Sequence, residues 1–369
     1  MYTIVVKVTH NCNLQCKYCY MSDVSEGDKM NEETLYNTLT KTAKLNAKDG
    51  KTDIIWHGGE PLLMGFDFYE KIVEIQNTIP NHIFNNNIQT NGMLLNDTYL
   101  NFFEQNKFRV GLSLDGIKKT HDQNRPCKNG KPSFEHTLVW IDELKKRKMG
   151  GGAICVLNKN TASHIAEIYE FAKEKHINFK FNPQLPAGKA IINDDLGLTP
   201  QELAQTYIEL FDMWFFDEAE DLPRIKPFEE IIQSIGASKN KQHREIIPFG
   251  CGWRNNCANN FLAIAPNGNI YPCGRFIGDS AFLYGNINNG DLSDTLKNST
   301  REKFVERSKG LLECKKCEYN KICNSGCPNH SYLFYENIMH KDPYCYTYKK
   351  LFKHIESILI DELKNFENE

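Results

Sequence analysis

Three cysteines lie close together near the start of the chain, in the stretch "THNCNLQCKYCY" that begins at Thr9. They are Cys12, Cys16 and Cys19. Three thiols cannot all pair as disulfides, and a tetrahedral zinc site needs a fourth ligand, for which His10 is a candidate. A cubane iron–sulfur cluster bound by three thiolates instead leaves one iron with an open position for a further ligand.

A second cysteine array occupies the last third of the chain. Its eight members are Cys251, Cys257, Cys273, Cys314, Cys317, Cys323, Cys327 and Cys345. Eight thiols are enough for two four-cysteine clusters, and also for two zinc ions, because Cys-x2-Cys pairs are common zinc ligands. Only Cys127 and Cys155 lie in the long middle part. We interpret both as ordinary structural residues.

Composition narrows the class of protein. The chain of 369 residues has a net charge of -3 and 40% hydrophobic residues, so we expect a globular protein that binds no nucleic acid. No apolar run of about 18 residues suggests a membrane span, and the N-terminus reads as a strand rather than a signal peptide. We therefore expect a cytoplasmic protein without membrane association, in which cysteines bind metal rather than form disulfides.

Alternating short apolar runs and amphipathic stretches predict the elements that position the first cysteine motif. Six strands are expected at 3–9, 53–57, 82–90, 108–116, 153–157 and 177–183, and helices at 32–47, 66–78, 97–106, 134–148 and 161–175. Each strand–helix–strand unit should be a right-handed parallel crossover. The units predict an α/β fold, a partial (β/α)6 TIM-like barrel, with reactive groups at the carboxyl ends of its strands.

The pattern changes after the sixth strand. Residues 194–245 read as a helical connection, and residues 246–369 as a small loop-rich domain that ends in a helix from about residue 346 to 368. Asn267-Gly268 predicts the turn of a hairpin. This last part has too few apolar runs for a conventional core, so we expect metal to hold it together. The predicted domains are thus 1–193, 194–245 and 246–369.

The spacing of Cys12, Cys16 and Cys19, with aromatic Tyr18 before the third cysteine, resembles the signature of the radical S-adenosylmethionine (SAM) enzymes. The resemblance implies that these cysteines bind a [4Fe–4S] cluster and that SAM is the ligand of its open iron. It also implies that the reduced cluster cleaves SAM to a 5′-deoxyadenosyl radical, which removes hydrogen from a substrate.

Further motifs fit the same resemblance. "WHGGEP" (Gly58, Gly59, Glu60) resembles the family's glycine-rich motif, which lets the backbone approach the methionine amino group. "QTNG" (Gln89, Asn91) and "SLDG" (Ser113) end strands where the family contacts ribose and carboxylate. Arg125 is the expected partner of the methionine carboxylate. Each motif alone also fits an ordinary turn, a capping loop or a solvated charge.

The second array resembles the twin-cluster SPASM domain. By that resemblance, Cys251, Cys257, Cys273 and Cys327 bind auxiliary [4Fe–4S] cluster I, and Cys314, Cys317, Cys323 and Cys345 bind cluster II. Full ligation of both points to electron transfer or structure rather than substrate binding. An electron donor such as flavodoxin or ferredoxin is expected.

Relatives of this type act on peptides. The layout resembles the anaerobic sulfatase maturases, which oxidise Cys or Ser to formylglycine. Those enzymes, however, carry Asp where this chain has Gly274, tend to have Gln in place of His57, and have Tyr in place of Met21. "WHGGEPLL" and "YPCGRFIGD" look more like the enzymes that cross-link precursor peptides. We therefore expect carbon–carbon (cyclophane) or thioether cross-linking of a ribosomal precursor peptide, with sulfatase maturation as the alternative.

Two questions stay open at this point. Asp279, His57 and Asp115 are the candidates for proton handling, although each also fits a structural role. A separate leader-binding module is not visible before the first strand, so we expect the barrel or the second domain to recognise the peptide. A non-catalytic metal-cluster scaffold is the alternative of another class.

Overall fold

Ten strands form a single sheet in the part of the chain that the computed structural model describes, which is residues 1–21, 29–239, 251–254 and 256–368. Their order is β10-β9-β8-β1-β2-β3-β4-β5-β6-β7, and the pairs from β8–β1 through β6–β7 are parallel. The strands are β1 (Thr3–Lys7), β2 (Lys51–His57), β3 (Ile83–Thr90), β4 (Arg109–Ser113), β5 (Gly150–Leu157), β6 (Phe179–Pro183), β7 (Ile225–Lys226), β8 (Phe261–Ile264), β9 (Asn269–Tyr271) and β10 (Gly285–Asn286).

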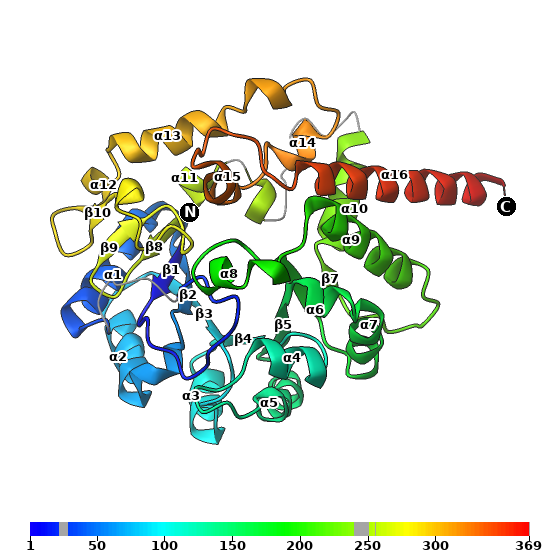
Figure 1. The fold of residues 1–369 in the computed structure, drawn as a ribbon. Helices are drawn as coiled ribbons and strands as arrows, with labels where there is room; N and C mark the ends of the chain where they lie inside the picture. Colours follow the sequence, from blue (N-terminus) through cyan, green and yellow to red (C-terminus); the bar gives the residue numbers. More distant parts are fainter. Residues whose placement is uncertain (22–28, 240–250, 255, 369) are drawn as a thin grey trace.

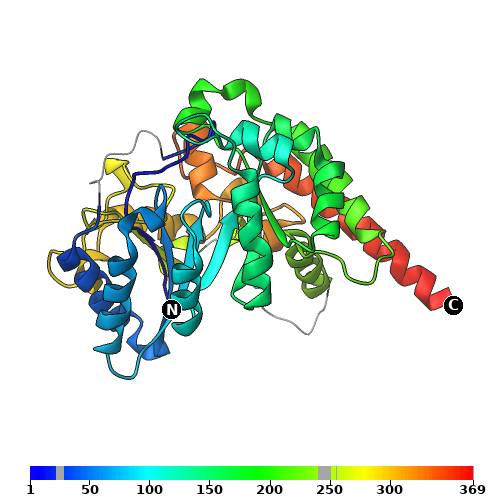
Figure 2. The same cartoon turned by 90° about the horizontal axis from the view of Figure 1, so that it is seen from below.

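Helices α2, α3, α5 and α7 lie along the outer side of the sheet, whereas α13 to α16 belong to the C-terminal part (Figures 1 and 2). The α-helices are α1 (Glu32–Leu45), α2 (Phe66–Asn77), α3 (Asp97–Gln105), α4 (Lys118–Asn124), α5 (Phe134–Lys146), α6 (Lys159–Ala162), α7 (Ile165–Glu174), α8 (Lys189–Ile192), α9 (Pro200–Phe215), α10 (Phe228–Lys239), α11 (Cys257–Asn260), α12 (Leu292–Thr295), α13 (Ser299–Ser308), α14 (Asn320–Cys323), α15 (Pro328–Tyr335) and α16 (Cys345–Asn368). None of these helices is both long and apolar enough to span a bilayer.

Alternation along the strands separates a packed face from an inner face. Ile4, Val6, Ile54 and Trp56 are fully buried in the hydrophobic core, and their neighbours in sequence point the other way, as a period of two requires. Side-chain caps fix where the helices begin. For example, Asn31 accepts a hydrogen bond from the Thr34 N–H at the start of α1.

The predicted barrel is confirmed. All six expected strands are present, and each adjacent pair from β1 to β6 is parallel. The five expected helices correspond to α1, α2, α3, α5 and α7. The last was expected to begin at residue 161, but it begins at Ile165, since the preceding residues form a separate short helix, α6, that Asn158 caps. Helix α4 was not expected, since its seven residues carry no apolar period.

The C-terminal part is more tightly joined to the barrel than expected. The predicted hairpin is present as β8 and β9, with Gly268 at a φ of 89° in its turn, but β8 also pairs in parallel with β1. The expectation of too little apolar core is wrong, because Phe276, Phe282, Phe304 and other aromatic side chains here belong to the continuous core of the chain. The boundary at 245/246 lies outside the described residues, so the three-part division stays a prediction.

Candidate active site

A cavity of about 740 Å³ lies at the carboxyl ends of β1 to β6. Its size falls in the usual range of cofactor and substrate sites. It brings together most of the site residues expected from sequence, namely Cys12, Cys16, Tyr18, Cys19, His57, Gly58, Gly59, Gln89, Asn91, Ser113 and Arg125. Glu60, Asp115 and Asp279 do not line it.

The loop after β1 presents the three cysteines to this cavity. The Leu14 N–H donates to Cys12 Sγ over 3.4 Å, and the Lys189 N–H, at the start of α8, donates to the Cys19 carbonyl over 3.0 Å. Burial raises the pKa of Cys12, and it raises that of Cys16 to about 12 against the opposing charge of Arg125. Burial thus favours the protonated form of Cys12 and Cys16, and a bound metal would replace these protons.

The glycines of "HGGEP" support this loop from the end of β2. A Cβ on Gly58 would lie 2.3 Å from the Thr9 carbonyl oxygen, and one on Gly59 would lie 2.3 Å from the Asn11 carbonyl oxygen. Backbone hydrogen bonds of 2.8 Å, from Gly59 N to Thr9 O and from Glu60 N to Asn11 O, close the contact. The absence of side chains at 58 and 59 thus lets the cysteine loop pack directly on β2.

Glu60 joins two neighbouring segments from a fully buried position. Its carboxyl group accepts hydrogen bonds from the Asn91 N–H (2.8 Å), the Thr90 hydroxyl (2.7 Å) and the Leu62 N–H (3.0 Å). Burial nevertheless raises its pKa to about 7. Glu60 therefore ties the ends of β2 and β3 together behind the cavity.

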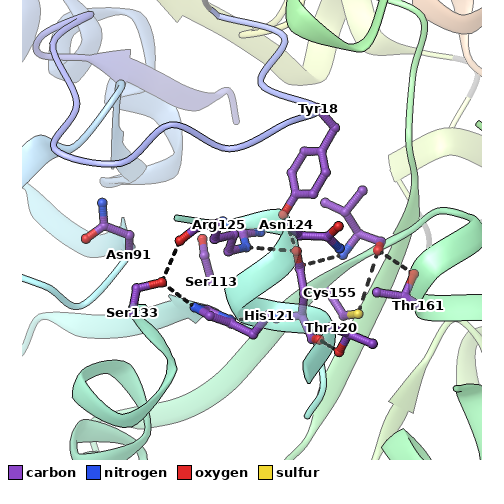
Figure 3. Close-up of polar contacts among 12 residues, drawn as sticks. Tyr18, Asn91, Ser113, Thr120, His121, Asn124, Arg125, Ser133, Cys155 and Thr161 are labelled. Atoms are coloured by element: carbon purple, nitrogen blue, oxygen red, sulfur yellow. Dashed lines mark hydrogen bonds and ion pairs between the residues drawn. The ribbon is translucent and has the colours of Figure 1, made fainter. Parts of the chain in front are cut away.

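Asp115 fixes the cation that lines the cavity, Arg125, which Figure 3 shows below the ring of Tyr18. Its Oδ2 lies 3.1 Å from Arg125 Nε and accepts a hydrogen bond from the Tyr18 hydroxyl, and its Oδ1 accepts from the Val156 N–H over 3.1 Å. Burial alone would lower the pKa of Arg125, but the charge and hydrogen bond of Asp115, together with Tyr18 and Cys16, outweigh it and raise the pKa. Arg125 therefore stays charged beside the cysteine loop.

Polar side chains from β3 and β4 complete the wall near the cysteines. Asn91 Nδ2 lies 3.8 Å from Cys12 Sγ, and Gln89 Nε2 donates to Ser113 Oγ over 3.2 Å. Gln89 occupies space that Gly111 leaves free, since a Cβ there would lie 2.6 Å from Gln89 Oε1. These amides and the hydroxyl are suited to a ribose or a carboxylate.

The three candidates for proton handling have different surroundings. His57 lines the cavity, but burial and the charge of Lys7 lower its pKa to about 3, which makes it a weak base. Asp115 is occupied by its three partners. Asp279 lies apart from the cavity, where it caps a short 3-10 helix through the Ala281 N–H and accepts from the Tyr332 hydroxyl over 2.7 Å.

The cysteines of the second array gather in the two sets that were expected. Burial raises the pKa of Cys257, and Cys251, Cys327 and Cys273 raise it further. The pKa of Cys323 is raised in the same way, with contributions from Cys345, Cys314 and Cys317. A small cavity is lined by all four thiols of this second set. Among the described residues, no three His, Cys, Asp or Glu side chains are arranged around a single metal ion.

Residues with chemistry that sequence reasoning missed also lie at the cavity. Arg275, Lys189 and Tyr20 line it, and the fully buried Lys7 contacts both Tyr20 and His57. A lysine that ends an otherwise apolar strand, "TIVVK", was the signal for Lys7. Arg275 carried no signal beyond its position two residues after Cys273.

The chain matches two family models. Residues 6–172 match the radical SAM superfamily, and residues 251–327 match an iron–sulfur cluster-binding domain, SPASM. These matches confirm the resemblance drawn from the cysteine motifs and imply SAM and [4Fe–4S] clusters as cofactors.

Relatives match over nearly the whole chain. A cysteine-type anaerobic sulfatase-maturating enzyme of Clostridium novyi is 30% identical, over 95% of this chain and 94% of its own. One of Clostridium perfringens is 29% identical, over 98% of both chains. The structure of native anSMEcpe with bound AdoMet and the Kp18Cys peptide superposes with a TM-score of 0.85 at 28% identity, and covers 99% of each chain.

These relatives overturn one expectation. Cross-linking of a precursor peptide was the main prediction, and it is wrong, because the proteins that match over the full length are sulfatase-maturating enzymes. The sequence alternative fits them instead. The departures at Gly274, His57 and Met21 weigh less than the common layout. The non-catalytic scaffold is also set aside, since the chain is a radical SAM enzyme that acts on a peptide or protein.

Proposed function

The chain belongs to the radical SAM superfamily and to the family of anaerobic sulfatase-maturating enzymes, and we propose that it oxidises a cysteine or serine of a sulfatase to formylglycine. The observation that carries this proposal is the relation to C. novyi and C. perfringens maturases over almost the entire chain. The cavity that collects the first three cysteines supports it.

Residues of this chain have distinct roles in the proposal. Cys12, Cys16 and Cys19 bind the first cluster, and Arg125, fixed through its Nε by Asp115, offers its remaining nitrogens to the carboxylate of SAM. Gln89, Asn91 and Ser113 bind the polar groups of the nucleoside. When bound, these cofactors supply the one-electron chemistry that removes a hydrogen atom from the substrate.

The second array serves the other half of a two-electron oxidation. Its two sets of four cysteines would bind auxiliary clusters that accept the second electron. Arg275 and Cys273 belong to the segment between the cavity and the first of these sets. A flavodoxin or ferredoxin in the cytoplasm is the proposed source of the electron that starts the reaction.

The test uses full-length protein with clusters reconstituted in the absence of oxygen. It is incubated with dithionite, SAM and peptides that span the modified cysteine or serine of a bacterial sulfatase. We expect 5′-deoxyadenosine and a peptide aldehyde that reacts with a hydrazide probe, and we expect neither from the Cys16→Ala variant. Formation of 5′-deoxyadenosine without any aldehyde, from either peptide, would contradict the proposal.

A further inference from the structure

One wall of the cavity is built around a buried lysine. Lys7 and His57 are paired neighbours at the carboxyl ends of β1 and β2, and Lys7 is fully buried. Its Nζ lies 2.8 Å from the Tyr20 hydroxyl and 3.2 Å from His57 Nδ1. No carboxylate among the described residues forms an ion pair with it. We call Lys7, Tyr20 and His57 the lysine wall.

The Lys7 ammonium group determines which hydrogen-bonding groups Tyr20 and His57 present to the cavity. Lysine has only donors, so the Tyr20 oxygen and His57 Nδ1 must accept from it. The Gly58 N–H also donates to His57 Nδ1, over 2.7 Å. The neutral ring therefore carries its proton on Nε2, and the Tyr20 hydroxyl keeps its own proton for another acceptor. Both side chains line the cavity, so the lysine wall offers donors with a positive charge behind them.

The described lining of the cavity is rich in cationic and polar side chains. The described residues that line it include no Asp or Glu, and its charged members are Arg125, Lys128, Lys189 and Arg275. Position 274 is a glycine. A Cβ at Gly274 would lie 3.2 Å from Lys7 Cε and 3.9 Å from Lys7 Nζ. An acidic side chain at 274 would neutralise Lys7, and this chain has none.

A donor-rich, cationic wall suits a substrate group that arrives as an anion. A cysteine thiol, with a pKa of about 8.5, loses its proton to solvent readily, whereas a serine hydroxyl needs a base. Resting on the function proposed above, we propose that Tyr20 and His57, with Lys7 behind them, bind the substrate cysteine as its thiolate, so that this chain selects cysteine over serine peptides.

The reaction balances without a protein base. The thiol proton goes to solvent before binding. The thiolate then loses one hydrogen atom from Cβ to the 5′-deoxyadenosyl group and one electron to an iron–sulfur cluster of the second array, and a C=S double bond forms. Water replaces the sulfur, which leaves as hydrogen sulfide, and formylglycine remains. Lys7 is a positioning residue in this scheme, since it acts through Tyr20 and His57.

The decisive measurement is peptide binding without turnover. Cluster-loaded enzyme with SAM and no reductant is titrated with fluorescein-labelled cysteine, serine and alanine versions of one sulfatase peptide, at about pH 6.5 and 8.5. The titratable groups of the lysine wall are Lys7, Tyr20 and His57, and the charged groups in the rest of the described cavity lining are Arg125, Lys128, Lys189 and Arg275. We expect the cysteine peptide to bind about fiftyfold tighter at the higher pH, because the thiolate fraction of a thiol with a pKa of about 8.5 rises by about that factor between the two pH values. The serine and alanine peptides should show no such gain.

Variants separate the lysine wall from general effects. Lys7→Met should abolish the pH-dependent gain and leave binding of the serine peptide unchanged, and Lys7→Arg should restore part of it. If Lys7→Met fails to fold, Tyr20→Phe takes its place in the test. This variant keeps the buried charge of Lys7 but lacks the hydroxyl donor, so it should reduce the pH-dependent gain. Lys128→Met removes another lysine at the cavity and should keep the gain in full.

Two results would overturn the inference. One is cysteine-peptide binding that does not change with pH or with the Lys7→Met substitution. The other is oxidation of the serine peptide as fast as the cysteine peptide once reductant is added, an outcome that leaves the proposed function intact. Failure of both peptides to give aldehyde, with the thiolate preference present in binding, would instead contradict the proposed function alone.

Discussion

A single buried carboxyl group near this site makes the stability of the folded chain depend on pH. Glu60 has a pKa of about 7 in the folded chain because it is buried, against 4.5 for an ordinary glutamate. The folded state therefore binds a proton that the unfolded state has released. The stability that Glu60 contributes is fully present below about pH 4.5 and is lost as the pH rises through 7.

Comparison with the Glu60→Gln variant, which has no carboxyl group at this position, should reveal the loss of stability with rising pH. From about pH 5.5 to 7.5, the free energy of unfolding of the wild type should fall by about 2 kcal/mol relative to Glu60→Gln, at about 1.4 kcal/mol per pKa unit. Thermal unfolding of both proteins at the two pH values, without oxygen, measures the difference. A difference that stays constant with pH would show that Glu60 titrates normally.

Residue type alone did not predict what each acid does. Asp115 and Asp279 were both candidates for proton handling, because a carboxylate after a strand or near a cysteine motif fits that role. In the structure, Asp115 is enclosed by Arg125, Tyr18 and the Val156 N–H, and Asp279 caps a short helix. The neighbours determine whether a carboxylate acts as a base or as a structural group, and several of them, such as Tyr18, Val156 and Tyr332, are distant in sequence.

At the scale of elements, the position of the cysteine loop depends on two glycines. Gly59→Ala would place a methyl group 2.3 Å from the Asn11 carbonyl oxygen and 2.5 Å from that of His10, both of them backbone atoms of the loop. The loop must therefore move away from β2. We expect this variant to bind less iron at the first cluster and to form at least tenfold less 5′-deoxyadenosine, since displacements of about 1 Å cost about a hundredfold in rate.

A second glycine provides the matched control. Gly236 lies in α10, and no atom lies within 4 Å of the place that an added methyl group would take, so Gly236→Ala should keep normal iron content. It should also gain slight stability, because alanine favours helix. Iron assay and chromatography of 5′-deoxyadenosine compare the two. Equal activity of Gly59→Ala and the wild type would show that the loop does not need its contact with β2.

One arginine organises the loops that carry the last cysteines. Arg307, on α13, is buried and donates hydrogen bonds to the carbonyl groups of Ile338, His340 and Ser325. Arg307→Met leaves these carbonyls without their donor, and we expect a loss of about 3 kcal/mol in stability. Iron and sulfide content should fall while the first cluster still cleaves SAM.

The control for Arg307 is Lys303, which is exposed on the same helix. Lys303→Met removes a charge of the same sign without removing buried hydrogen bonds, so its iron content should match the wild type. Should Arg307→Met also keep all its iron, the cysteines themselves would be sufficient to order these loops.

Local patterns predicted the elements better than their assembly. The six barrel strands and the hairpin at Asn267-Gly268 follow from apolar alternation and turn chemistry, which act within a few residues. The pairing of β8 with β1 joins segments more than 250 residues apart, and nothing in "FLAI" specifies that partner. Lys7 was missed for the same reason, since its importance lies in Tyr20, His57 and Gly274.

At the scale of the whole molecule, the sheet is continuous from the barrel into the C-terminal part. β8 pairs with β1, and the aromatic side chains of this part extend the same core. α16 packs along α9 and then projects beyond the rest of the chain (Figures 1 and 2). The segment 310–345 is different, because it contains no strand among its described residues and carries five of the eight later cysteines.

This division predicts which region depends on iron. The clusters can be removed with a chelator in the absence of oxygen. Their removal takes away the metal that links the cysteines of this segment, Cys314, Cys317, Cys323, Cys327 and Cys345. The backbone hydrogen bonds of β8 to β1 and β9 remain. Hydrogen–deuterium exchange measured by mass spectrometry should therefore increase by more than tenfold in peptides from 310–345 and change little in β8. The reason is that backbone groups in an opened loop exchange with water, while those in a sheet stay protected. Equal increases in both regions would mean that the clusters stabilise the entire sheet rather than this segment.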